Sequence, residues 1–95
     1  MKWGDTMKTI TEMLKTMTPE EVVAKKPVLS VLDVEADMKY HGVKTSPSRV
    51  RAMIKNGQYP FAIWYMNKTF QCDIFTKPYI EYIDKMFGLP QKENV

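Results

Sequence analysis

The sequence contains one cysteine, Cys72, and no run of apolar residues that approaches the roughly 20 needed to cross a bilayer. A single cysteine cannot form an internal disulfide. Cys72 lies in an apolar–polar alternation, which favours a buried structural thiol in a reducing compartment over a reactive one. Residues 2–5 lack the apolar block of a signal peptide. We therefore expect a cytoplasmic protein with no membrane among its partners.

The motifs of common catalytic and metal sites are also missing. The chain has no glycine-rich phosphate loop, no paired cysteine motif and no nucleophile with a recognisable base partner. His41 is the only histidine and has no cysteine near it in sequence, so we expect no metal site. Glu20 and Glu21 suit helix capping better than acid–base catalysis. The sequence thus predicts a protein that is not an enzyme and that needs no cofactor.

Acidic residues are absent from the middle of the chain. Residues 38–72 hold six Lys or Arg residues and no Asp or Glu, so this segment carries a charge of +6. The rest of the chain has eight basic and eleven acidic residues. Uninterrupted positive charge attracts a polyanion such as nucleic acid, provided that it lies on a suitably shaped surface. Chance clustering on a solvated face is the alternative.

Turn and capping signals divide the 95 residues into short elements around one modest core. Hydroxyl N-caps followed by proline or an acidic residue mark helix starts at Thr18, Ser30 and Ser46. Capping and apolar periodicity together predict helices over residues 5–17, 18–26, 30–41, 46–56 and 76–87.

Strand signals occupy the remaining segments. Residues 28–29 predict a brief extended piece, and two alternating runs, 61–66 and 69–74, predict a β-hairpin turning at Asn67-Lys68. Short helices with a hairpin at the edge predict an α+β fold.

The helix expected over residues 46–56 has two contrasting sides. Val50, Met53 and Ile54 recur on one side, as core residues do. The opposite side has small residues in the middle and cations toward its edges, namely Ser48, Arg49, Arg51, Ala52 and Lys55. A helix that enters the DNA major groove needs this pattern, because small residues allow close approach while arginines reach base edges or phosphates. An ordinary surface helix with solvated arginines is the alternative.

Residues 46–60 read Ser46-Pro47-Ser48-Arg49-Val50-Arg51-Ala52-Met53-Ile54-Lys55-Asn56-Gly57-Gln58-Tyr59-Pro60. This stretch, with the hairpin and closing helix expected after it, resembles the excisionase and MerR-like winged helix-turn-helix family. The resemblance covers roughly residues 28–87. It implies a small winged helix-turn-helix domain over residues 28–88 with a two-stranded β-hairpin as its wing. Residues 1–27 form an N-terminal helical arm in this interpretation, and residues 89–95 a mobile tail.

The resemblance also implies which residues contact DNA. The recognition helix places Ser46, Ser48, Arg49, Arg51 and Lys55 at the major groove, and Arg49 and Arg51 are the candidates for reading guanine. Asn67 and Lys68 lie at the wing tip, and Lys44 and Lys55 suit phosphate contacts. Three departures stand out: a turn before Ser46 that is two residues longer than usual, acidic residues in the preceding helix, and a wing with only one lysine.

Two apolar sets remain open to more than one interpretation. The aromatic residues of the hairpin region (Trp64, Tyr65, Phe70 and Phe75) could stack on unpaired bases, but hairpin aromatics more often pack against a helix, and we expect packing. The stripe of the arm (Met7, Ile10, Leu14 and Met17) is expected to pack on the chain's own core, with contact to a dimer mate or another partner as the second choice.

These observations favour sequence-specific binding of double-stranded DNA in an excisionase-like role. The chain would then be an accessory, architectural factor of a mobile genetic element at recombination or transfer sites. A recombinase or relaxase would be its partner, with homodimers or cooperative assembly on DNA. One alternative is a transcriptional regulator of a phage or plasmid. Another is a protein-interaction module or inhibitor that uses the arm and the basic face.

Overall fold

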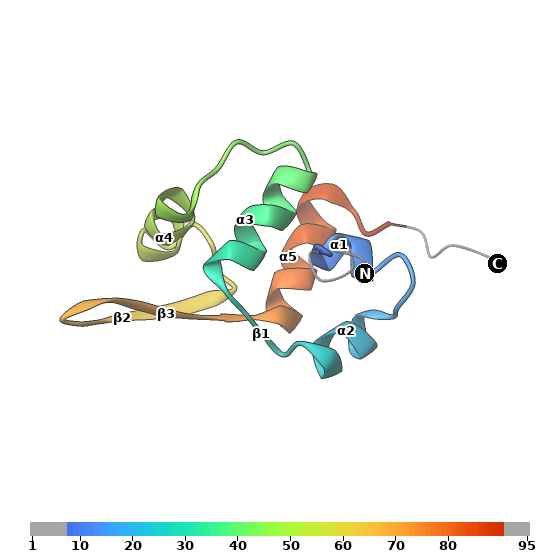
Figure 1. The fold of residues 1–95 in the computed structure, drawn as a ribbon, viewed down its shortest axis with the longest axis horizontal. Coiled ribbons are helices and arrows are strands. Elements are labelled where there is room, and N and C mark those ends of the chain that lie inside the picture. The colour runs from blue at the N-terminus through green and yellow to red at the C-terminus, as the bar shows by residue number, and fades with distance from the viewer. Residues whose placement is uncertain (1–7, 91–95) are drawn as a thin grey trace, which may run out of the picture.

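The computed structural model describes residues 8–90 of the chain. These residues form an α+β fold, as the sequence predicts, with five helices and three strands (Figure 1). In chain order the elements are α1 (Ile10–Met13), α2 (Pro19–Lys25), β1 (Val28–Leu29), α3 (Val31–Tyr40), α4 (Pro47–Lys55), β2 (Ala62–Asn67), β3 (Thr69–Phe75) and α5 (Thr76–Phe87). No helix within residues 8–90 is long and apolar enough to traverse a bilayer.

The sheet has three antiparallel strands in the order β1-β3-β2, rather than the two that the sequence predicts. The hairpin itself is confirmed, with β2 and β3 in register from Ala62↔Ile74 to Asn67↔Thr69. The additional strand arises because the extended pair Val28–Leu29 aligns with the end of β3. The amide of Thr76 donates to the carbonyl of Pro27 and its hydroxyl donates to the carbonyl of Lys26, which fastens the new strand to the start of α5.

Capping side chains set the helix starts where the sequence predicts them. The hydroxyls of Thr18 and Ser30 accept from the amides of Glu21 and Asp33, whose carboxylates accept in return from the cap amides. The first helix is shorter than predicted. A further capping box, formed by Thr9 and Glu12, puts Thr9 in extended backbone, so α1 begins only at Ile10. The predicted residues 5–7, with Met7 of the apolar stripe, lie outside the described residues.

One hydrophobic core joins all five helices to the sheet. Ile10 and Leu14 are buried in it, so this part of the arm packs on the chain's own core, as predicted. Helix α1 packs against α3, and α2 packs against α5. Phe87, at the end of α5, is 41% exposed and stacks on the ring of His41 at 4.2 Å between centroids.

Helix α4 and the hairpin lie on the side of the fold away from α1 and α2. Figure 1 shows α4 and the β2–β3 ribbon extending together on one side of α3 and α5, with α1 and α2 on the other. Helix α4 contacts α3 and β2. Helix α4 and the hairpin therefore form one end of the described fold, and α1 and α2 do not cover it.

Candidate nucleic-acid interface

Helix α4 is fixed by its cap and by a narrow apolar stripe. The hydroxyl of Ser46 accepts a hydrogen bond of 3.2 Å from the amide of Arg49, and Pro47 occupies the first helical position. Val50 and Ile54 are 0% and 2% exposed, so this side of the helix lies in the core. The opposite side therefore has to face outward.

The outward side of α4 is formed by Ser48, Arg49, Arg51, Ala52 and Lys55, all of which are exposed. We call these residues the basic face of α4. Arg49 and Arg51 form no ion pair with any of the described residues. Their guanidinium groups keep all five N–H donors available to a ligand. The basic face of α4 therefore combines exposed, unneutralised cations with small residues between them.

The positive charges of Arg49 and Arg51 lower the pKa values of two different groups, Tyr59 and Cys72. Burial raises the pKa of Tyr59, the neighbouring Tyr82 raises it further, and Arg49 partly opposes the shift. Burial likewise raises the pKa of the Cys72 thiol, here opposed by Arg51. Tyr59 follows α4, whereas Cys72, which is half-buried rather than buried, lies on β3. Arg49 and Arg51 immediately precede and follow the buried Val50 on α4, so the basic face has a cation on either flank.

Lys55 and Trp64 connect the basic face of α4 to the hairpin. The Lys55 ammonium lies 5.9 Å from the centroid of the Trp64 ring, within the range of a cation–π interaction. Trp64 in turn stacks on Phe70 across the hairpin at 5.8 Å between centroids. The Lys55 charge therefore lies between α4 and the hairpin and stays at the surface, because Lys55 is exposed.

The remaining predicted residues lie at the hairpin turn and in the segment between α3 and α4. Asn67 and Lys68 are exposed at the turn between β2 and β3, and Lys68 has a φ of 67°, in the left-handed region that few residues other than glycine adopt. Lys44 is exposed in the segment between α3 and α4. The structure thus gathers Ser46, Ser48, Arg49, Arg51 and Lys55 on one helix, with Lys44 just before it and the hairpin turn beyond it.

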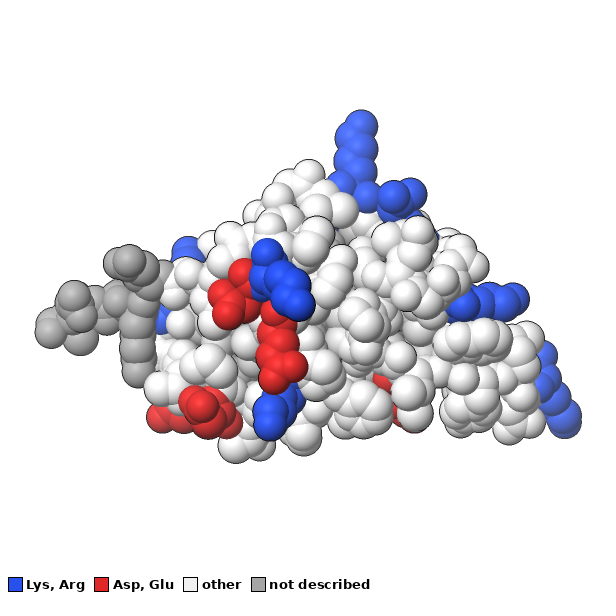
Figure 2. All heavy atoms as spheres, turned by 180° about the vertical axis from the view of Figure 1, so that it is seen from behind, with Lys and Arg blue, Asp and Glu red and all other residues white. Residues whose placement is uncertain are grey.

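Charge is unevenly distributed over the surface. On the face shown in Figure 2, Lys and Arg spheres stand apart at the end that carries α4 and the hairpin. The Asp and Glu spheres lie mainly over the rest of the molecule, several of them beside lysines. Two ion pairs belong to that other region, Lys26 with Asp33 at 3.3 Å and Lys39 with Glu35 at 2.9 Å. The cations of α4 therefore stand apart from the acidic part of the surface.

The hairpin aromatics are more exposed than the sequence predicts. Trp64, Tyr65 and Phe75 are 39%, 51% and 39% exposed, and only Phe70 is half-buried. The packing expected for these three is wrong. Trp64 and Tyr65 belong to β2, and the ribbon extends beyond the helices that would have covered it (Figure 1), whereas Phe75 lies on the face of β3 opposite to that of the buried Ile74. The signal in the sequence was the run Ile63-Trp64-Tyr65-Met66, in which apolar side chains point to both faces of a strand.

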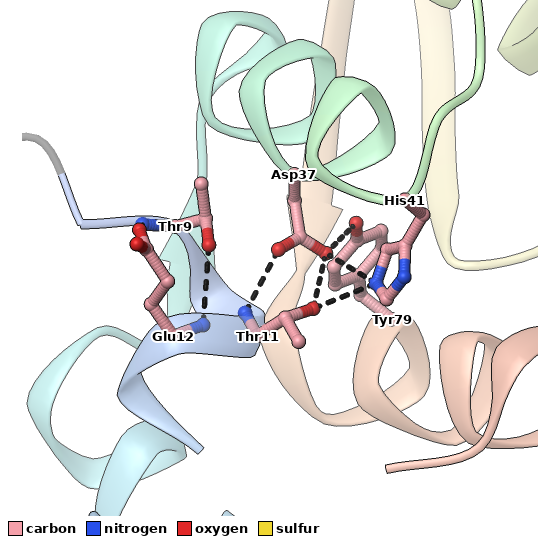
Figure 3. Close-up of polar contacts among 6 residues, drawn as sticks. All are labelled: Thr9, Thr11, Glu12, Asp37, His41 and Tyr79. Atoms are coloured by element: carbon pink, nitrogen blue, oxygen red, sulfur yellow. Dashed lines mark hydrogen bonds and ion pairs between the residues drawn. The ribbon is translucent and has the colours of Figure 1, made fainter. Parts of the chain in front are cut away.

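A buried polar cluster that the sequence did not reveal holds the arm in place (Figure 3). Asp37, on α3, is 0% exposed and accepts from the amide of Thr11 at 2.8 Å and from its hydroxyl at 3.0 Å. Tyr79, on α5, donates to the same carboxylate at 2.6 Å. Because the Thr11 proton goes to Asp37, the Thr11 oxygen accepts from the His41 ring at 2.8 Å. These contacts join α1, α3 and α5, on the side away from the basic face of α4.

No protein-family model, no curated protein and no solved structure matches this chain. The functional assignment therefore depends on the geometry of α4 and the hairpin.

Proposed function

We propose that this chain binds double-stranded DNA sequence-specifically, as a winged helix-turn-helix protein of the excisionase and MerR-like type. In this proposal α3 and α4 are the helix-turn-helix pair, α4 is the recognition helix, and β2 and β3 form the wing. The observation that carries the proposal is the exposure of Arg49 and Arg51 on α4, with no carboxylate partner among residues 8–90.

The shape of the basic face of α4 suits the major groove. This groove is about 12 Å wide and admits one α-helix. Ser48 and Ala52 have small side chains in the middle of the face, so the helix backbone can approach the base edges. Arg49 and Arg51 then reach toward the two walls, where a guanidinium can donate to O6 and N7 of one guanine. Such a bidentate contact distinguishes one base pair from another.

The flanking residues suit the DNA backbone. Lys55, placed between α4 and the hairpin by its contact with Trp64, is positioned for a phosphate beside the groove. Lys44 precedes α4 and is exposed, which also favours a phosphate contact. Asn67 and Lys68 form the wing tip and would contact the backbone or the adjacent minor groove. With one lysine, the wing would contribute less affinity than α4.

The small size of the module favours an accessory role. One module of this kind buries only about 600–1,000 Å² of protein surface on DNA, which limits the affinity of a single copy. We therefore propose that several copies act at adjacent sites, shaping DNA for a recombinase or relaxase of a mobile genetic element. In this role the chain itself performs no chemistry.

Selection from a random duplex library tests the proposal. The wild-type protein should enrich a short motif, and its affinity for that motif should exceed its affinity for unrelated duplexes by about 10³-fold or more. Binding should weaken with salt, because phosphate contacts release counterions. Equal affinity for all duplexes, or no binding at moderate salt, would contradict sequence-specific recognition.

A further inference from the structure

Strand β2 has one unpaired edge and an unusual composition for such an edge. In the described part of the chain, β3 is the only strand beside β2. The strand reads Ala62-Ile63-Trp64-Tyr65-Met66-Asn67 and contains neither a charge nor a proline. Edge strands usually carry such residues to prevent pairing with other chains. Ile63, Tyr65 and Met66 are 58%, 51% and 58% exposed, so the apolar edge is accessible.

The hydrogen-bond register shows which residues of β2 present their backbone to this edge. The amide of Phe75 donates to the carbonyl of Phe61, so these two residues form a hydrogen-bonded pair. Hydrogen-bonded pairs alternate along an antiparallel ladder, so Ile63 and Tyr65 also point their backbone groups toward β3. The N–H and C=O groups of Ala62, Trp64 and Met66 therefore point to the free edge.

From this register we infer that β2 pairs antiparallel with β2 of a second copy of this chain, on a two-fold axis at Trp64. Trp64 then faces its own copy, and Ala62 faces Met66 of the other copy, which gives about six backbone hydrogen bonds. Ile63 faces Tyr65 of the other copy in a close pair of a β-branched and an aromatic residue. Pro60, which has no N–H, ends the ladder.

The free edge of β2 is complementary to itself, and for this reason we infer that a second copy of the chain binds there. In this register each apolar residue from Ala62 to Met66 faces another apolar residue, and no charge opposes a charge. Moving the axis to Tyr65 would instead place Ile63 opposite Asn67 and Ala62 opposite Lys68. The pairing joins two sheets into one of six strands, and it does not depend on the proposed DNA binding. Because the contact is small, we expect a weak dimer.

Two matched double variants test this register. In Ile63→Lys/Tyr65→Lys, lysines face each other across the axis, and the dimer should be lost. In Ile63→Lys/Tyr65→Glu, opposite charges face each other, and the dimer should be retained and should weaken with added salt. Both positions are exposed, so circular dichroism should show both variants folded. Sedimentation velocity from low to high micromolar concentration reports the mass.

The wild type should change from monomer to dimer over that range. Amide exchange adds an independent measurement: the N–H groups of Trp64 and Met66 should gain protection as the dimer forms, whereas that of Ile63, already bonded to β3, should change little. A wild type that stays monomeric over the whole concentration range overturns the inference. That result is expected if the edge of β2 pairs only with a peptide of another protein. Equal association of the two double variants also overturns the inference.

Discussion

The hydroxyl of Tyr79 donates a hydrogen bond of 2.6 Å to Oδ2 of Asp37, so a fully buried polar contact joins α5 to α3. The same carboxylate accepts from both the amide and the hydroxyl of Thr11. A buried carboxylate is costly unless its oxygens are hydrogen-bonded, and here three donors from two other elements supply those bonds. The contact fixes α1 against α3 and α5, away from α4.

Asp37→Ala should detach the arm and destabilise the fold. The change leaves the Thr11 amide and the Tyr79 hydroxyl without their acceptor, so we expect a loss of about 2–4 kcal/mol in the free energy of unfolding. Thr11→Val removes only a hydroxyl and should cost about 1 kcal/mol. Urea denaturation measures both, and amide exchange should show α1 opening first in the Asp37 variant. Equal small losses in both variants would contradict the role of the carboxylate.

Alkaline pH should weaken the fold through Tyr79. Burial, and then the neighbouring Asp37, raise the pKa of this phenol far above its ordinary value of about 10. Above pH 10 the unfolded chain loses the Tyr79 proton while the folded chain keeps it. The contribution of Tyr79 is therefore full below pH 10 and declines by about 1.4 kcal/mol per pH unit above it.

Comparison of the wild type with Tyr79→Phe isolates this effect. The variant loses the hydrogen bond at neutral pH, but its free energy of unfolding should fall less steeply between pH 10 and 11. All other titrating groups are shared, so their contributions cancel in the difference. Parallel pH profiles for the two proteins would show that Tyr79 ionises alike in the folded and unfolded chains.

Helix starts and the hairpin could be predicted because their signals are local. Thr18 and Ser30 cap helices through residues three positions away, and the residues that form β2 and β3 are adjacent in sequence. The basic face of α4 also follows from spacing alone, since Val50 and Ile54 fix which side is buried. These parts of the fold and of the candidate site needed no knowledge of distant contacts.

The features that were missed depend on residues far apart in the chain. Strand β1 exists because Val28 aligns with Phe75, 47 positions later in the sequence. The acceptor role of Asp37 needs Thr11 and Tyr79, which come from opposite ends of the chain. The exposure of Trp64 reflects where the ribbon extends relative to the helices, which periodicity does not report.

Lys68 has a left-handed backbone conformation, which costs stability, and it also supplies the positive charge of the hairpin turn. Lys68→Gly should relieve the strain of a φ of 67° and raise or leave unchanged the free energy of unfolding, because glycine adopts this region without steric cost. The same change removes the wing-tip cation. Binding to DNA should therefore weaken equally for all sequences, and the salt slope should fall by about 1.

Lys68→Arg is the matched control, since it keeps both the strained backbone and the charge. It should leave the salt slope and the stability near those of the wild type. A slope that is unchanged in the glycine variant would mean that the hairpin turn does not contact phosphate.

The central claim is that Arg49 and Arg51 read DNA bases. Two double variants make the most direct test, measured as the dissociation constant for the duplex selected by the wild type and for an unrelated duplex. Arg49→Gln/Arg51→Gln lowers the net charge by two on the basic face of α4. Lys25→Gln/Lys85→Gln lowers it equally at exposed positions on α2 and α5.

The account predicts that the arginine variant loses about 2–6 kcal/mol on the selected duplex, at 1–3 kcal/mol for each base contact, and much less on the unrelated duplex. The lysine variant should lose little on either duplex. Equal losses in the two variants, or the same loss on both duplexes, would contradict base recognition by α4.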